Sequence, residues 1–177
     1  MESVVRDAVL LTLTDSLRSH GSWCGETHLQ KATYFLQEVT RVPLRFEYVL
    51  YRHGPFSFDL RKELTAMRAN NLLALEPAFE YGPRFKATDV GAALLSFCTD
   101  EVKPYERSVE FVSSWLGPMG VVELERAATA LFVIRTDENE SDAQQVELIT
   151  TYKPHISREL AQSAIQDVKS KLKQYAA

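Results

Sequence analysis

Apolar residues recur every three or four positions through most of the chain, which is typical of helices that bury one face. We expect helices at residues 3–19, 27–39, 57–69, 88–97, 105–116, 121–134, 141–152 and 157–175. Thr27 and Gln30 have the spacing of a capping box, so the second helix is expected to begin at Thr27. The helix at 121–134 is apolar on most sides, which predicts a buried central element.

Two stretches interrupt the helical pattern and predict strands. Residues 45–51 alternate loosely and are rich in strand formers, while 72–75 and 84–87 predict a hairpin with a wing-like tip. His53-Gly54-Pro55 has turn chemistry, and Ser57 can cap the helix that follows. No strand-like interval follows Pro104. We therefore expect an α+β, mostly α-helical fold: a winged-helix-like core with a small antiparallel sheet at residues 1–100, and a helical extension packed on it at 101–177.

Composition and charge narrow the classes of protein. A chain of 177 residues with 45% hydrophobic and 25% charged residues can bury a substantial core as one compact unit. The first residues lack signal-peptide features, and no apolar run approaches the ~20 residues that a bilayer requires, which favours a cytoplasmic protein that does not enter the membrane. The net charge of −4 means that any DNA binding would depend on a local basic patch.

Three short motifs occur in a distinctive order. They are THLQKATYFLQ at 27–37, HGPFS at 53–57 followed by Leu60 and Leu64, and KPHIS at 153–157. Together they resemble the phage-associated proteins that include the Panacea and SocA-like antitoxins, and more closely the bacterial YwgA-type proteins. The resemblance spans roughly residues 25 to 160. It implies a compact helical fold with a winged-helix-like element, used in regulation, toxin neutralisation or phage-linked conflict, and it implies no catalytic residues.

The leading functional prediction is a non-enzymatic protein-binding module in such a bacterial setting. Aromatic residues and Arg supply many of the hot spots of protein interfaces. Tyr51, Arg52 and Phe56 are the preferred candidates, and the partner would be a toxin or regulatory protein. A homodimer is a further alternative, because the last helix carries a near-heptad apolar stripe that can pack within the chain or against a second copy of it. That stripe consists of Ala161, Ala164, Ile165, Val168, Leu172 and Tyr175.

A DNA-binding transcriptional regulator is the first alternative. Basic residues gather around the third helix and the predicted wing, where they could meet phosphates or base edges. These residues are Arg52, Arg61, Lys62, Arg68, Arg84 and Lys86. Asp59 and Glu63 share the helix and would oppose a phosphate backbone, and the linker at 40–56 is far longer than a helix-turn-helix turn. The competing interpretation is a solvated helix face with ordinary ion pairs.

An unrecognised enzyme is the second alternative. His53 and His155 are each candidate general bases, although neither has a nucleophile or carboxylate at a recognisable spacing. Cys24 and His28 supply two of the three or four ligands that zinc needs, and the two cysteines, Cys24 and Cys98, suggest reduced structural thiols. Since no GxSxG, HExxH, P-loop or GxGxxG motif occurs, we predict neither a metal nor a cofactor.

Overall fold

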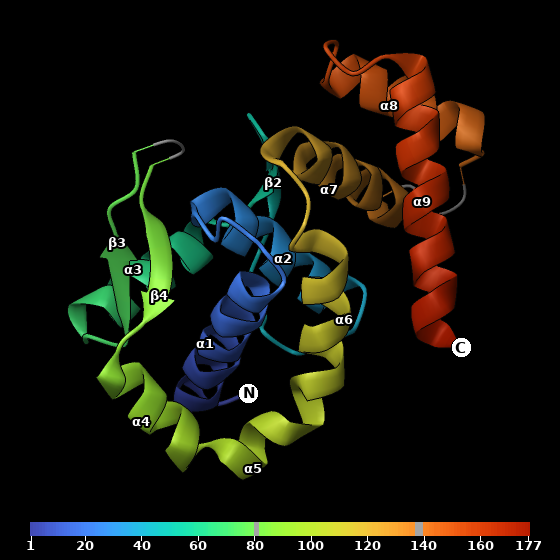
Figure 1. Ribbon diagram of the computed structural model, residues 1–177. Helices are drawn as coiled ribbons and strands as arrows, with labels where there is room; N and C mark the ends of the chain where they lie inside the picture. Colours follow the sequence, from blue (N-terminus) through green and yellow to red (C-terminus); the bar gives the residue numbers. More distant parts are fainter. Residues whose placement is uncertain (80–81, 137–139) are drawn as a thin grey trace.

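The computed structural model describes residues 1–79, 82–136 and 140–177, and these residues form a mostly helical α+β fold with two small two-stranded antiparallel sheets (Figure 1). The elements in chain order are α1 (Ser3–Ser19), α2 (Glu26–Glu38), β1 (Val49–Tyr51), β2 (Gly54–Phe56), α3 (Phe58–Ala69), β3 (Leu73–Glu76), β4 (Arg84–Ala87), α4 (Asp89–Phe97), α5 (Thr99–Val102), the 3-10 helix η1 (Lys103–Tyr105), α6 (Glu106–Leu116), α7 (Val121–Thr136), α8 (Asp142–Tyr152) and α9 (Arg158–Ala176).

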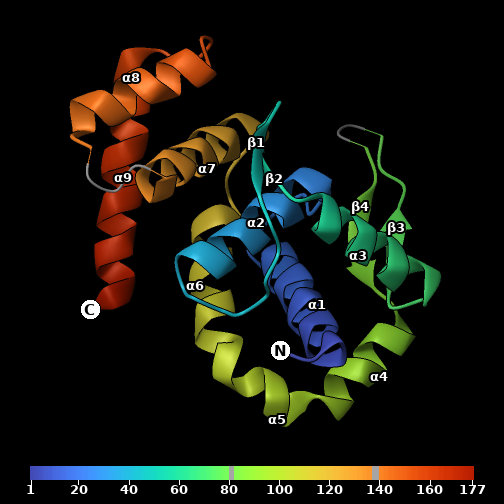
Figure 2. The same cartoon turned by 180° about the vertical axis from the view of Figure 1, so that it is seen from behind.

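Helix α1 lies at the centre of the first part of the fold. It is in contact with α2, α4, α5, α6 and β4, which surround it in both views (Figures 1 and 2). This explains why its apolar residues are buried on more than one side, in contrast to a simple surface helix. The buried apolar side chains of α1 are Ala8, Val9, Leu10, Leu11, Leu13 and Leu17.

The later helices extend the same hydrophobic core. Helix α6 packs on α1 and α2, and α7 packs on α2 and β2 as well as on α8 and α9. Ala161, Ile165 and Val168 of α9 are buried in the chain itself, so the stripe on the last helix is largely covered at home. The prediction that 121–134 is a buried central element is confirmed by the position of α7 between α2 and the α8–α9 pair (Figure 1). Within the described residues, no helix is both long enough and apolar enough to cross a bilayer.

The two hairpins flank α3, one on each side (Figure 2). In the first hairpin Val49 lies opposite Phe56 and Tyr51 lies opposite Gly54. In the second, β3 pairs with β4 from Leu73 opposite Ala87 to Glu76 opposite Arg84. Residues 80–81 of the loop between β3 and β4 lie outside the described residues.

The expected strand at residues 45–51 is wrong in its first half. Only Val49–Tyr51 forms a strand, because the side chain of Gln37 bonds to both main-chain groups of Phe46, at 2.9 and 3.0 Å, and Arg45 has a positive φ of 63°. The predicted turn at 53–55 is also shorter than expected, since Gly54 and Pro55 belong to β2. The tertiary contact from α2 therefore determines the backbone here, and not the alternation of apolar and polar side chains.

The predicted cap at Ser57 is confirmed, and three of the later helices begin with a side-chain cap of the same kind. Ser57, Thr88, Ser141 and Ser157 each accept a bond from a main-chain N–H in the first turn of the following helix. The predicted capping box at Thr27 is wrong, because α2 begins one residue earlier, after Gly25, without a side-chain cap. The side chain of Gln30 bonds instead to a residue outside its own helix.

Candidate functional site

An exposed apolar surface lies on the β1–β2 hairpin and the start of α3. Rings of Tyr51, Phe56 and Phe58 form a triangle with centroid separations of 5.8 Å (Tyr51–Phe56), 5.8 Å (Tyr51–Phe58) and 5.1 Å (Phe56–Phe58). Val49 shares this side of the hairpin, because it lies two residues from Tyr51 and opposite Phe56. Tyr51 is 48% exposed and Phe58 is 50% exposed. We call Val49, Tyr51, Phe56 and Phe58 the hairpin face.

The structure brings together the three residues that the sequence suggested for protein binding. Tyr51 and Phe56 belong to the hairpin face, and the exposed Arg52 follows directly in the turn between the strands. Phe58 was missed, although it lies two residues beyond Phe56 in an aromatic-rich segment. Arg61 of α3 also borders this surface, since its guanidinium lies over the Phe56 ring at 4.9 Å and bonds to both carboxylate oxygens of Glu26 at 2.7 and 3.2 Å.

Buried polar side chains of α2 bond to the main chain of β2 and of Ser57, which follows it. Gln30 accepts a bond from the main-chain N–H of Ser57 and donates one to its carbonyl, both at 2.9 Å. The neighbouring Lys31 is only 2% exposed, and its Nζ donates to the carbonyl of Pro55 at 3.0 Å. The Gln-Lys pair of the first motif is therefore the part that binds the second motif, which explains why Gln30 does not cap its own helix.

The third motif holds the other strand. Lys153, in the segment between α8 and α9, is buried, and its Nζ donates to the carbonyl of Tyr51 at 2.7 Å and to that of Arg52. All three motifs thus meet at one hairpin, although they are far apart in the sequence. Lysines in apolar surroundings were the signal that sequence reading could have used, because a buried ammonium requires several acceptors.

Glu125 of α7 is the buried carboxylate that completes this arrangement. Its Oε1 lies 3.4 Å from Nζ of Lys153 and 3.3 Å from Nε2 of His155, and its Oε2 lies 3.7 Å from Nδ1 of His53. Both histidines that the sequence left without a carboxylate therefore share the same one. Sequence reading missed Glu125, and the available signal was a carboxylate within a broadly apolar helix.

Burial shapes the electrostatics beneath the hairpin. It lowers the pKa of Lys31 from its ordinary value of 10.5 to about 8, and the charge of Glu125 opposes this shift.

The β1–β2 hairpin also packs closely against α2 and α7. Gly54 has a φ of +86°, and a Cβ there would lie 3.3 Å from Thr129 Oγ1 and 3.6 Å from Lys31 Cε.

A small pocket adjoins the hairpin face where β1–β2, α2 and α3 meet. Its volume is about 160 Å³, and Tyr51 and Phe56 form part of its wall. The other lining residues are mainly charged or polar: Glu26, Thr27, Gln30, Lys31, Arg52, His53, Gly54 and Arg61.

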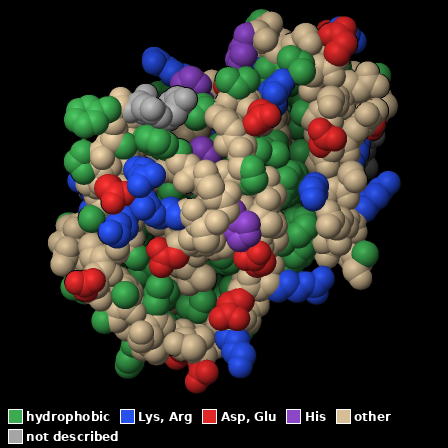
Figure 3. All heavy atoms as spheres, in the orientation of Figure 1, with side chains coloured by type: hydrophobic (Ala, Val, Ile, Leu, Met, Phe, Trp, Pro, Cys, Tyr) green, Lys and Arg blue, Asp and Glu red, His purple; other side chains and the backbone are tan. Residues whose placement is uncertain are grey.

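Of the six basic residues proposed for DNA binding, the exposed Arg52 lies beside the hairpin face and the other five fall into two groups. Arg61 is paired with Glu26, Lys62 with Asp59 at 3.0 Å, and Arg84 with Glu76 at 2.9 Å. Arg68, near the end of α3, and Lys86, on β4, are exposed. On the face shown in Figure 3, Lys and Arg side chains lie among Asp and Glu side chains, which is the pattern of an ion-paired surface.

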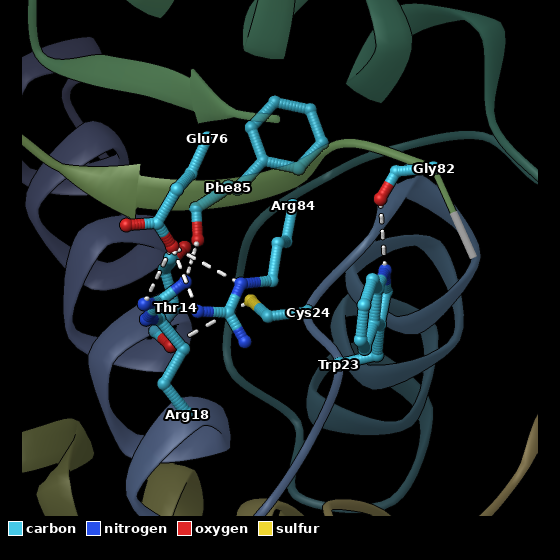
Figure 4. A network of polar contacts seen from close by, with 8 residues as sticks. All are labelled: Thr14, Arg18, Trp23, Cys24, Glu76, Gly82, Arg84 and Phe85. Atoms are coloured by element: carbon cyan, nitrogen blue, oxygen red, sulfur yellow. Dashed lines mark hydrogen bonds and ion pairs between the residues drawn. The ribbon is translucent and has the colours of Figure 1, made fainter. Parts of the chain in front are cut away.

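The β3–β4 hairpin is tied to α1 by the polar network in Figure 4. Arg18 donates to the carbonyl of Phe85 at 3.0 Å and to Glu76 at 3.1 Å, and Arg84 also bonds Glu76. Bonds from Arg84 and Arg18 lower the pKa of Glu76. In addition, Arg84 lies over the Trp23 ring at 5.4 Å, so its guanidinium is held by two partners.

Cys24 and His28, which the sequence left open as two metal ligands, bond to separate parts of the chain. Cys24 Sγ donates to the carbonyl of Thr14 at 3.7 Å, and burial raises the pKa of this thiol to about 12. His28 Nε2 lies 2.9 Å from the carbonyl oxygen of Met119. Among the residues that the structure describes, no three His, Cys, Asp or Glu side chains are grouped to hold a metal ion.

No protein-family model matches the chain, and no curated protein matches it. The resemblance to the Panacea and SocA-like antitoxins and the YwgA-type proteins therefore rests on the three motifs.

Proposed function

We propose that this chain is a non-enzymatic protein-binding module that docks its partner on the hairpin face and Arg52. One observation carries the proposal: three rings in mutual contact, two of them half exposed, lie on the β1–β2 hairpin and at the start of α3. The buried Lys31 and Lys153 bond to the main chain of this hairpin, and the buried Gln30 bonds to Ser57 directly after it. A surface held in this way loses little conformational freedom on binding, and exposed aromatic residues beside an arginine are typical of interface hot spots.

The order of the elements supports the β1–β2 hairpin as the docking surface. The element order α1, α2, α3, β3, β4 supports our proposal of a winged-helix-like core, in which β1–β2 is an additional hairpin inserted before α3. The partner in our proposal binds the inserted hairpin. The resemblance of the three motifs favours a bacterial regulatory, antitoxin or phage-defence setting, in which the partner is a toxin or a regulatory protein.

A capture experiment with matched variants tests the proposal. The purified chain is used to capture partners from the native host, and the Tyr51→Ala and Phe58→Ala variants are compared with wild type. Phe97→Ala is the control, because Phe97 is 81% exposed but lies on α4. We expect capture of a specific protein to fall about tenfold in the two hairpin variants and to persist in the control. Unchanged capture in the hairpin variants, with circular dichroism showing that all three fold, contradicts the proposal.

DNA binding is the second candidate function, and one observation favours it. Arg68 of α3 lies with Leu73, Ala74 and Leu75 of β3 around one surface depression, so the end of the third helix adjoins the wing as a recognition helix would. Retardation of promoter DNA at low salt, lost in Arg68→Glu and Lys86→Glu and weakened steeply by added salt, would support it. Absence of retardation at low salt contradicts it.

A further inference from the structure

We infer that the pocket beside the hairpin face receives an acidic side chain, so that the partner presents an Asp or Glu next to an apolar residue in an extended segment. This inference rests on the proposed function and specifies the chemistry of the partner. It follows from the charges, the hydrogen-bond donors and the shape of the pocket.

The pocket is positively charged on a protein that is negatively charged overall. Lys31, Arg52 and Arg61 line it against one carboxylate, Glu26, and the buried pair of Lys153 and Glu125 lies beneath the hairpin. These groups leave a formal excess of two positive charges, whereas the whole chain has a net charge of −4. Complementary charge of this kind selects partners and speeds their association.

Donors remain for an incoming carboxylate. The bonds from Arg61 to Glu26 use its Nε and Nη2 groups, two of the five N–H groups of a guanidinium. Lys31 is buried and donates to the carbonyl of Pro55, so it contributes its positive charge to the pocket and not an exposed donor. Arg52 is exposed at the hairpin turn, where the structure gives it no ion pair within the described ranges. A carboxylate with charged donors around it forms the stronger class of hydrogen bond.

The pocket is small, and it is continuous with the hairpin face. Its volume of about 160 Å³ suits one acidic side chain. Tyr51 and Phe56 belong both to its wall and to the hairpin face, so a residue next to the bound carboxylate would rest on the exposed rings. The apolar contact is the reason we favour an acidic protein segment over a nucleic-acid backbone, whose phosphates would leave the half-exposed rings of Tyr51 and Phe58 uncovered unless bases stacked on them.

Selection from a displayed library of random 12-residue peptides tests the inference even while the natural partner is unidentified. We expect the wild-type chain to enrich peptides with Asp or Glu beside an aromatic or aliphatic residue. A parallel selection on Arg52→Glu should lose this preference. Lys103→Glu is the matched control, because it makes the same charge change at an exposed position on η1, and it should enrich the same peptides as wild type.

Fluorescence anisotropy with the most enriched peptide then separates the two parts of the argument. Replacing its acidic residue by the corresponding amide should weaken binding about tenfold, and Arg52→Glu should weaken the acidic peptide but change binding of the amide peptide by less than about threefold. Tyr51→Ala should weaken both peptides. Raising the pH from 7 to 9 should weaken only the acidic peptide, because Lys31 loses its proton in this range.

The outcomes distinguish failure of the inference from failure of the proposed function. Enriched peptides that bind through Tyr51 but carry no acidic preference overturn the acidic pocket and leave the hairpin face as the docking surface. Failure to enrich any peptide that depends on Tyr51 counts against both. Single-stranded DNA that competes for the same site with a steep salt dependence would overturn the choice of a protein segment.

Discussion

The two β-hairpins on either side of α3 are held to the fold in different ways. Buried side chains of Lys31 and Lys153 bond to the main chain of the β1–β2 hairpin, and the buried Gln30 bonds to that of Ser57 directly after it. The β3–β4 hairpin is held through both its main chain and its side chains. Its Phe85 main chain bonds to Arg18 and to the Cys24 carbonyl, and its Glu76 and Arg84 side chains pair with each other and with Arg18 near the surface (Figure 4).

This difference determines what each hairpin can present to a partner. Because its main chain is the part that is bonded, the β1–β2 hairpin keeps Tyr51 half exposed beside Phe58. The β3–β4 hairpin uses Arg84 for attachment, and this reduces the basic charge it can offer to DNA. Buried attachment is also less sensitive to salt than attachment by surface ion pairs, and this gives a direct way to test the comparison.

The largest expected effect is that of Lys153→Met. This change removes the bonds to the carbonyls of Tyr51 and Arg52 and the nearest lysine from the buried Glu125. Breaking a buried charged interaction on one side should lower the free energy of unfolding by about 3–5 kcal/mol. Urea denaturation measures this free energy of unfolding. Lys169→Met is the control, because it removes a more exposed pair with Asp142 and should cost about 1 kcal/mol or less. Equal losses in the two variants would contradict the buried-attachment account.

The next effect is a pH dependence that belongs to Lys31. The folded chain releases this proton near pH 8, whereas the unfolded chain holds it to about 10.4. In this window the unfolded state binds more protons, so the Lys31 contribution makes the free energy of unfolding rise with pH. Relative to Lys31→Met, wild type should gain roughly 2–3 kcal/mol between pH 7.5 and 10.5. Parallel stability curves for the two proteins across this range would show that the pKa of Lys31 is not lowered.

A pair of glycine substitutions compares the hairpins directly. Gly54 and Gly82 have φ values of +86° and +82°, but only Gly54 has atoms within 4 Å of an added Cβ. Gly82→Ala should therefore cost about 1 kcal/mol for the backbone conformation alone, and Gly54→Ala about 2 kcal/mol because Thr129 must also move. Thermal denaturation compares the two variants. A larger loss at Gly82 would be inconsistent with the close packing of the first hairpin.

The smallest effect is expected for Glu76→Gln at the β3–β4 hairpin. The change weakens the bonds from Arg18 and Arg84 at a half-buried position near the surface, where ion pairs contribute little. We expect a slight fall in Tm at low salt that disappears at about 1 M NaCl, whereas the loss in Lys153→Met should persist. A salt-independent fall for Glu76→Gln would show that both hairpins are held by the same kind of interaction.

The helices could be predicted from the sequence because their signal is local. Apolar spacing placed the helices that became α1, α7 and α9, and Ser57 was correctly assigned as a cap. The errors arose where a side chain bonds to a distant main-chain group. The Thr27 and Gln30 spacing indicated a capping box, but the partner of Gln30 is Ser57, 27 residues away. Nothing in the local pattern distinguishes these two uses of a glutamine.

The candidate site could be predicted in part for the same reason. Tyr51 and Phe56 are close in sequence and lie on one hairpin, so their contact follows from local structure. The Glu125 carboxylate lies more than seventy positions from His53 and about thirty from His155 in the sequence. It belongs to α7, whereas both histidines lie in turns. Its role depends on how α7 packs beneath the hairpin, and the spacing of the histidines contains no information on that packing.

The bonds from Lys153 have a consequence for the order in which the protein matures. They join main-chain and side-chain atoms 102 and 101 residues apart, so they can form only after residue 153 has left the ribosome. Until then the main chain of the first hairpin lacks its bonds to Lys153. Nascent chains that stop before residue 153 would therefore expose the three rings without the rigid support that prepares them for a partner, and competence to dock is acquired late in synthesis.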